Sequence, residues 1–246
     1  MREAVIVSVA RTPIGKAYKG AFNNLTSPSL AAHAIEAAVE RSGISKDEVD
    51  DCIMGAAIQQ GTQGMNFGRQ AAMAAGFPTS VAGMTIDRQC SSGLMAIAAG
   101  AQQIIVDGSS IVVAGGCESI SLAQTDKMNM YKAVDAKVKA LTPAVYMPML
   151  DTAEVVAHRY NVTRATQDEY ALISQQRTAA AQAAGKFDDE IVPVTCTKIE
   201  FDKATGETST IEVTLTQDEG NRPSTTLEGL SSLNAVKDNG TITGGN

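Results

Sequence analysis

One cysteine stands where a catalytic nucleophile would be expected. The stretch 85–108, TIDRQCSSGLMAIAAGAQQIIVDG, changes from a strand-like to a helix-like pattern at Cys90. A cysteine in the first turn of a helix meets unpaired backbone N–H groups and the positive end of the helix dipole, which both favour the thiolate. Ser91, Ser92 and Gly93 follow it and carry little bulk, so a ligand can approach the sulfur closely. The same pattern also fits an inert buried cysteine in a strand-to-helix turn, and both interpretations stay open at this point.

The remaining cysteines and the histidines do not form the pattern of a metal site or of a catalytic pair. The four cysteines are far apart, without a CxxC pair and without a histidine at metal-ligand spacing. We therefore expect reduced thiols and no metal. His33 and His158 both fall within helix-like patterns, and we interpret them as structural.

Composition excludes some classes of protein. The chain has 246 residues, 44% of them hydrophobic, with no run of eighteen apolar residues and no basic and apolar leader. These features predict a soluble intracellular protein without a membrane span. The net charge of −7 disfavours nucleic acid and anionic membranes as partners. Residues 127–139 are a local exception with four lysines; they fit a phosphorylated ligand or simply a solvated surface.

The first half of the chain alternates between strand and helix patterns. Strands are expected at residues 4–10, 49–57, 81–88 and 110–114, and helices at 27–41, 66–75 and 91–106. This alternation predicts a mainly parallel sheet that is covered by helices. Ligands gather at the carboxyl ends of such strands. The loops there carry residues 11–13, 59–64, Cys90 and 115–116.

The pattern changes after Gly116. Helices are expected at 152–160 and 166–184, the second with a capping box of Thr166 and Glu169, and a hairpin around the turn at 203–206. We therefore expect three parts: a first domain at 1–117, an inserted loop domain at 118–240, and the start of a return into the first domain at 241–246. The last residues, GTITGGN, fit either a flexible end or a truncated chain.

Taken together, eight segments in order resemble the thiolase family along essentially the whole chain. They are ARTPIG, GRQAAMAAGFP, DRQCSSGLMAIAAGAQQI, VAGGCESIS, TAEVVA, FDDEIVP, NRPSTTLEGL and GTITGGN. The resemblance implies a thiolase-like layered α/β fold. Its amino-terminal half-domain would have a mixed, mainly parallel sheet that lacks its last strand here, plus the inserted loop domain.

The resemblance also implies a reaction. Thiolases transfer acyl groups between coenzyme A thioesters, by thiolytic cleavage of a 3-ketoacyl-CoA or by the reverse Claisen condensation. By resemblance, Cys90 is the nucleophile that takes the acyl group, which gives ping-pong kinetics, and its backbone N–H is one donor of an oxyanion hole. The base residues of the family are a histidine in a glycine-histidine-proline motif and a second cysteine, both in a C-terminal half that this sequence does not contain. The chain is therefore expected to be the amino-terminal part of an enzyme, inactive without its other half.

Two further residues receive roles from the resemblance. Arg222 falls on an arginine that holds the adenosine-phosphate end of coenzyme A, with an exposed loop arginine as the alternative. Met149 falls beside the acyl and pantetheine path, where core packing is the alternative. Pro148 stands where acetoacetyl-CoA-forming members often carry a histidine, which favours broader-specificity or degradative members.

The expected partners and the alternatives follow from this resemblance. We expect coenzyme A and acyl-CoA as substrates, no bound cofactor or metal, a role in fatty acid metabolism, and a cytoplasmic homodimer or homotetramer. Two alternatives stay open: a related ketoacyl synthase, and a non-catalytic acyl-CoA-binding or scaffold protein on the same fold. An insertion of about 120 residues between two strands disfavours the synthase, and the presence of Cys90 disfavours the scaffold.

Overall fold

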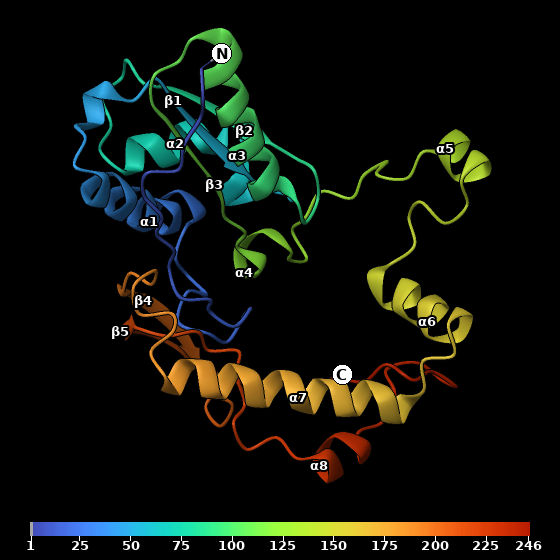
Figure 1. The fold of residues 1–246 in the computed structure, drawn as a ribbon. Helices are drawn as coiled ribbons and strands as arrows, with labels where there is room; N and C mark the ends of the chain where they lie inside the picture. The colour runs from blue at the N-terminus through green and yellow to red at the C-terminus, as the bar shows by residue number, and fades with distance from the viewer. Residues whose placement is uncertain (1) are drawn as a thin grey trace. The chain divides into compact units, whose positions relative to one another are not determined.

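The computed structural model describes residues 2–246, which divide into two compact units (Figure 1). The first unit runs to Met128 and also includes Asp188–Gly220. The second consists of Asn129–Phe187 and Asn221–Asn246. The expected domain boundaries after residue 117 and at residue 240 stay a prediction, because they concern the plan of the family rather than the contacts within this chain.

A three-stranded parallel sheet forms the centre of the first unit. Its strands are β1 (Asp51–Gly55), β2 (Ala82–Ile86) and β3 (Val112–Gly116), in the order β2-β1-β3. At the carboxyl edge of the sheet, Gly55 is in register with Ile86 on one side and with Gly116 on the other. The expected parallel α/β arrangement is therefore confirmed, and the three strand ends lie side by side.

Helices cover both faces of this sheet. Alternate residues of a strand point to opposite faces. Cys52 and Met54 pack in a hydrophobic core with side chains of α1 (Ser27–Ser42) and α2 (Phe67–Ala74). The alternate residues of β1 and β3 face α3 (Ser92–Gln102), because Gly100 of that helix lies against Val112 and Ala114. Hence α1 and α2 share one face, and α3 lies on the other.

Local sequence signals explain where the helices of this unit begin and end. The helix α1 has a proline in its first turn and ends at Gly43, whose φ of 72° is in the left-handed region. The helix α2 begins after Asn66, whose side chain accepts a hydrogen bond from the Arg69 backbone N–H at 3.2 Å. These ends agree with the expected helices to within two residues.

The prediction of a strand at residues 4–10 is wrong. The segment is extended but is not part of any sheet, and Val5, Ile6 and Val7 are each more than 70% exposed. A β-branched run favours extended backbone, whereas a strand also needs a neighbour that exchanges hydrogen bonds with it. Segment 4–17 lines a cavity of about 780 Å³ together with residues of α1, α3 and β3.

An antiparallel hairpin completes the first unit. Its strands β4 (Val194–Phe201) and β5 (Thr208–Leu215) confirm the expected hairpin, and Val194 packs on Ala21 and Phe22. A short helix, α4 (Ile120–Ala123), follows β3.

The second unit is helical. It contains α5 (Ala136–Leu141), α6 (Met149–Arg159), α7 (Arg164–Ala183) and α8 (Leu227–Ser231). The two expected helices are confirmed as α6 and α7, but the expected capping box is wrong. Thr163 caps α7 by accepting a hydrogen bond from the Thr166 N–H at 3.2 Å. Thr166 lies inside the helix because the hydroxyl three residues earlier already satisfies its N–H.

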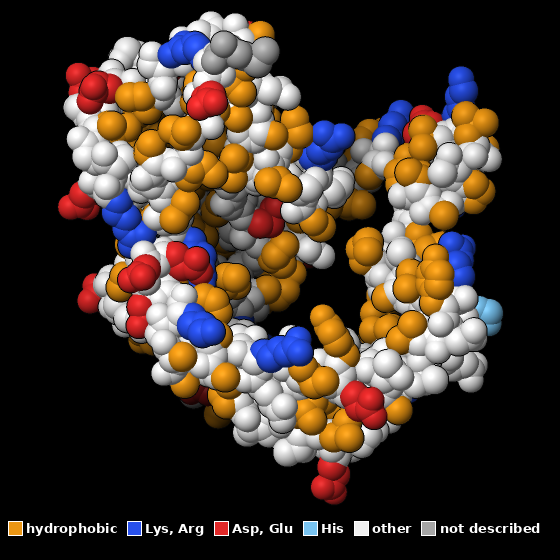
Figure 2. All heavy atoms as spheres, in the orientation of Figure 1, with side chains coloured by type: hydrophobic (Ala, Val, Ile, Leu, Met, Phe, Trp, Pro, Cys, Tyr) orange, Lys and Arg blue, Asp and Glu red, His pale blue; other side chains and the backbone are white. Residues whose placement is uncertain are grey.

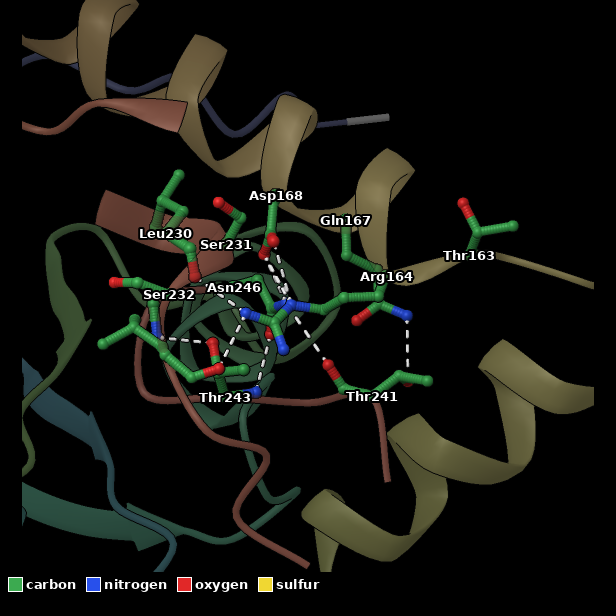
Figure 3. A network of polar contacts seen from close by, with 12 residues as sticks. Thr163, Arg164, Gln167, Asp168, Leu230, Ser231, Ser232, Thr241, Thr243 and Asn246 are labelled. Atoms are coloured by element: carbon green, nitrogen blue, oxygen red, sulfur yellow. Dashed lines mark hydrogen bonds and ion pairs between the residues drawn. The ribbon is translucent and has the colours of Figure 1, made fainter. Parts of the chain in front are cut away.

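A buried carboxylate joins the long helix α7 to the end of the chain (Figure 3). Asp168 is only 1% exposed and accepts hydrogen bonds from Arg164 Nε at 2.9 and 3.0 Å and from Asn246 Nδ2 at 2.7 Å. Arg164 also donates to the carbonyls of Leu230 and Leu233. This network, Arg164–Asp168–Asn246, thus ties α7 both to the region of α8 and to residues 241–246.

Hydrophobic side chains are also exposed on the surface of both units (Figure 2). In the part of the chain that the structure describes, no helix combines the length and the apolar composition that a membrane crossing would need.

Candidate functional site

Cys90 lies in a tight turn between β2 and α3. The strand β2 ends at Ile86, and α3 begins at Ser92 with Ser91 as its N-cap residue. The thiol is exposed, which excludes the interpretation of Cys90 as a buried packing residue. Gln89, immediately before it, has a φ of 51°, a conformation that is costly for a residue with a side chain and concentrates at functional turns.

Ser92 holds this turn together. Its hydroxyl is buried, accepts a hydrogen bond from the Arg88 N–H at 2.8 Å and donates to the Gln89 carbonyl at 2.6 Å. The Ser92 backbone N–H donates to the same carbonyl at 3.0 Å. Among residues 2–246, the Cys90 N–H has no hydrogen-bond acceptor, so it is available to an incoming oxygen.

No base is bonded to the Cys90 thiol within the described residues. His33 lies in α1 of the first unit, and His158 lies in α6 of the second unit. The described residues also contain no group of histidines, cysteines and carboxylates that would hold a metal ion. Thus the site as described consists of an exposed thiol, a free backbone N–H and a rigid turn.

The other cysteines of the first unit differ from Cys90 in their surroundings. Burial raises the pKa of the Cys52 thiol to about 12, and burial together with the nearby Glu118 raises the pKa of Cys117 to about 12 as well. Burial and the charge of Glu219 also raise the pKa of Cys196. A thiol with a raised pKa is a poor nucleophile at neutral pH because the thiolate is scarce. Cys90 is therefore the best nucleophile candidate of the four.

A second polar group ties together the loops that follow β1 and β3. The Glu118 carboxylate accepts hydrogen bonds from the Ala57 N–H at 2.8 Å and from the fully buried Gln63 side chain. Gln63 also bonds to Ser27 at 3.1 Å and to the Ser119 N–H. Sequence reasoning assigned no role to Gln63 or Glu118. The available signal was a glutamate two residues after the glycines that end a strand at the functional edge.

Arg11, in the first loop of the expected functional edge, has a structural role. Its guanidinium forms a bidentate ion pair with Asp218, at 2.8 and 3.0 Å, and a third contact with Glu190 at 2.7 Å. Burial by itself raises the pKa of Asp218, but the hydrogen bonds from Arg11 and the Ile14 N–H and the charge of Arg11 outweigh it and lower that pKa. Arg11 thus anchors segment 11–14 to the residues that flank the hairpin.

The two expected coenzyme A residues both belong to the second unit, whereas Cys90 belongs to the first. Met149 is the first residue of α6 and is 74% exposed, so packing in a core does not explain it. Arg222 is exposed in a turn before α8. Its backbone N–H donates to Gln175 Oε1 at 2.7 Å and its carbonyl accepts from Thr225, while its guanidinium bonds to no other described residue.

Comparison with known proteins places these features in a family. A family model described as "Thiolase, N-terminal domain" matches residues 4–246. A 3-ketoacyl-CoA thiolase of Bacillus subtilis is 41% identical over 100% of this chain and 62% of its own length. A peroxisomal 3-ketoacyl-CoA thiolase 1 of Arabidopsis thaliana is 40% identical over 99% of this chain and 54% of its own.

A solved structure agrees with these sequence matches. The crystal structure of the Bacillus anthracis acetyl-CoA acetyltransferase superposes with a TM-score of 0.82 at 36% identity, covering 100% of this chain and 62% of that one. The chain therefore spans somewhat less than two thirds of the length of these proteins. The chain belongs to the thiolase family and corresponds to its N-terminal domain.

Proposed function

We propose that the complete protein is an acyltransferase that acts on coenzyme A thioesters, and that Cys90 is the residue that becomes acylated. The observation that carries this proposal is the exposed Cys90 thiol in a rigid turn at the start of α3, in a chain of the thiolase family. The 3-ketoacyl-CoA thiolase and the acetyl-CoA acetyltransferase among its relatives are named for this chemistry.

The reaction proceeds in two steps that share one acyl-enzyme. In thiolysis, the Cys90 sulfur attacks the C3 carbonyl of a 3-ketoacyl-CoA, and the C2–C3 bond breaks. The departing acetyl-CoA carbanion takes a proton, and the thiol of a second coenzyme A then removes the acyl group from the cysteine. In condensation, an acyl-CoA acylates Cys90 and releases coenzyme A, and the α-carbanion of a second acyl-CoA takes the acyl group. The free Cys90 N–H would stabilise the oxyanion that forms in the first step.

Both directions need bases, which we propose come from a C-terminal half of the same enzyme. The family places a histidine and a second cysteine there, and no base bonds to Cys90 within the described residues. Segment 4–10, beside a cavity of about 780 Å³, supports this proposal, because an added strand would find exposed apolar side chains and backbone outside any sheet there. The reaction requires no metal and no bound redox cofactor.

For coenzyme A itself, we assign Arg222 to the adenosine-phosphate end and Met149 to the acyl and pantetheine path. The guanidinium of Arg222 is exposed and bonds to none of the other described residues, so it is available to a phosphate or an adenine. Met149 presents an exposed flexible thioether. Beyond the thioester class, Pro148 favours a broader-specificity or degradative member of the family, and we place the enzyme in fatty acid metabolism.

We further propose a cytoplasmic homodimer or homotetramer with the three-part domain plan described above. The bacterial relatives favour the cytoplasm, whereas the Arabidopsis relative is named as peroxisomal. Cell fractionation tests the location, and sedimentation velocity tests the assembly state. A monomer at micromolar concentration would contradict the proposed assembly.

The decisive experiment is mass spectrometry of the complete protein after incubation with an acyl-CoA. We expect one acyl group, mapped to the peptide that contains Cys90, and its loss on addition of coenzyme A. The Cys90→Ala variant should take up no acyl group, whereas the control Cys196→Ala should behave as wild type. An adduct on another residue, or none at all, would contradict the proposal and favour a non-catalytic acyl-CoA-binding protein.

A further inference from the structure

Two paired glycines lie directly beneath the turn that carries Cys90. Gly55 ends β1 and Gly116 ends β3, and the two residues are in register across the sheet. Side chains of paired residues in neighbouring parallel strands point to the same face. Gly55 and Gly116 therefore both face α3, on the side of the sheet that this helix covers.

The first peptide of α3 lies against both glycines. A Cβ atom on Gly55 would stand 2.2 Å from the Ser92 carbonyl carbon and 2.5 Å from the Gly93 nitrogen. A Cβ on Gly116 would stand 2.9 Å from the Gly93 Cα. Neither glycine is among the residues with positive φ, so the missing side chain and not the backbone conformation is what matters. The two glycines thus set how closely the start of the helix approaches the edge of the sheet.

The contact between Gly55 and the Ser92 peptide affects the position of Cys90, because Ser92 is bonded to the turn that carries the cysteine. The Ser92 peptide contacts Gly55, and the Ser92 hydroxyl bonds to Arg88 and Gln89, immediately before the cysteine. A Cβ on Gly55 at 2.2 Å must move to at least 3.4 Å for ordinary contact, a displacement of about 1 Å. Because the turn is short and the Ser92 hydroxyl and N–H bond to Arg88 and Gln89, it would move together with Ser92 rather than deform.

We propose that Gly55 is a positioning residue for Cys90, with Gly116 as its weaker partner. This inference rests on the proposed function of Cys90 and goes beyond it. The glycines place the thiol and the Cys90 N–H at a fixed height above the carboxyl edge of the sheet, where an acyl carbonyl must meet both. A displacement of about 1 Å can cost an enzyme up to about 10²-fold in rate without removing any reacting group.

The test compares two alanine substitutions that both bring a Cβ within 3.0 Å of helix backbone, at different places in the same sheet. Gly55→Ala crowds α3 at the Cys90 turn, whereas Gly83→Ala crowds α2, with its Cβ 2.5 Å from the Arg69 Cα. Gly220→Ala, where nothing lies within 4 Å, is the neutral control. Each variant of the complete protein is mixed with an acyl-CoA, and the acylation of Cys90 is followed by quenched-flow mass spectrometry. Alkylation of Cys90 by iodoacetamide is measured alongside, because a small reagent needs no docking geometry.

We expect Gly55→Ala to slow acylation by about 10²-fold and iodoacetamide alkylation by less than about threefold. We expect Gly83→Ala to lower the thermal unfolding midpoint about as much as Gly55→Ala does, yet still to be acylated at the wild-type rate. Gly116→Ala, with its milder conflict, should fall between Gly55→Ala and the wild type, and it replaces Gly55→Ala if that variant does not fold.

The outcomes separate this inference from the proposed function. If wild-type Cys90 takes no acyl group, the proposed function fails, and this inference fails with it. If the wild type is acylated and Gly55→Ala keeps its rate to within about threefold, the positioning role alone is overturned. An equal loss in Gly83→Ala would overturn it too, because the effect would then follow general stability.

Discussion

The buried network around Asp168 makes a quantitative prediction about α7 and residues 241–246. In the substitution Asp168→Ala, Arg164 Nε and Asn246 Nδ2 lose acceptors at 2.9–3.0 and 2.7 Å. Removal of one member of a buried ion pair costs about 3–5 kcal/mol. Arg164 is 27% exposed and keeps the carbonyls of Leu230 and Leu233, so its charge stays partly solvated. We therefore expect the free energy of unfolding to fall by about 3 kcal/mol, the lower end of this range.

Hydrogen exchange followed by mass spectrometry measures this loss where it occurs. A loss of about 3 kcal/mol corresponds to roughly 10²-fold faster exchange in peptides that cover residues 164–183 and 241–246. Glu169→Ala is the matched control, because Glu169 is the next residue of α7 and is exposed. Asp168→Asn, which keeps one acceptor oxygen, should give an intermediate effect. Exchange in Asp168→Ala within about threefold of that in Glu169→Ala would refute the reasoning.

Three further predictions concern the first unit. Iodoacetamide at pH 8 should label exposed Cys90 first and Cys117 barely, because burial raises the Cys117 pKa to about 12; equal rates in peptide mapping would contradict this. The Arg11–Asp218 pair should stabilise the fold fully at pH values above about 3.9, the pKa of an aspartate in the unfolded chain. This stabilisation should be lost as the pH falls through the lowered pKa of Asp218 in the folded protein. The difference in urea midpoint between wild type and Asp218→Asn should therefore shrink below pH 4, and a constant difference would exclude the linkage. Gln63→Leu leaves several buried hydrogen-bonding groups without a partner and should lower the free energy of unfolding in urea by about 3 kcal/mol. A loss under about 0.5 kcal/mol would be inconsistent with the role of the Gln63 hydrogen bonds.

Local patterns in the sequence predicted most of the helices and strands. The helices near residues 27–42, 67–74 and 164–183 and the hairpin strands follow from apolar periodicity, caps and turn residues that lie within a few positions of each other. The position of Cys90 between a strand and a helix was likewise predictable, because the change of period occurs at that residue. Such signals need no knowledge of distant neighbours.

The errors arose where the neighbour is distant in sequence. Residues 4–10 have the composition of a buried strand, but extended backbone becomes a strand only beside a partner, and no partner strand lies there among the described residues. Arg11 sits in a loop at the expected functional edge, yet partners about 200 positions away make it an anchor. The capping box around Thr166 is a local exception, because the hydroxyl of Thr163, three residues earlier, accepts the hydrogen bond of the Thr166 N–H.

Sequence alone therefore determined the family and the order of most helices and strands, and it predicted Cys90 as the nucleophile, because these depend on residue types and short spacings. The tertiary structure decided what surrounds Cys90. It showed that the Cys90 thiol is exposed, that Cys52 is buried and Cys117 half-buried, both with raised pKa values, and that Gly55 lies under the Ser92–Gly93 peptide. Exposure, pKa and close approach all depend on atoms brought together from distant segments, and only the folded chain places those atoms.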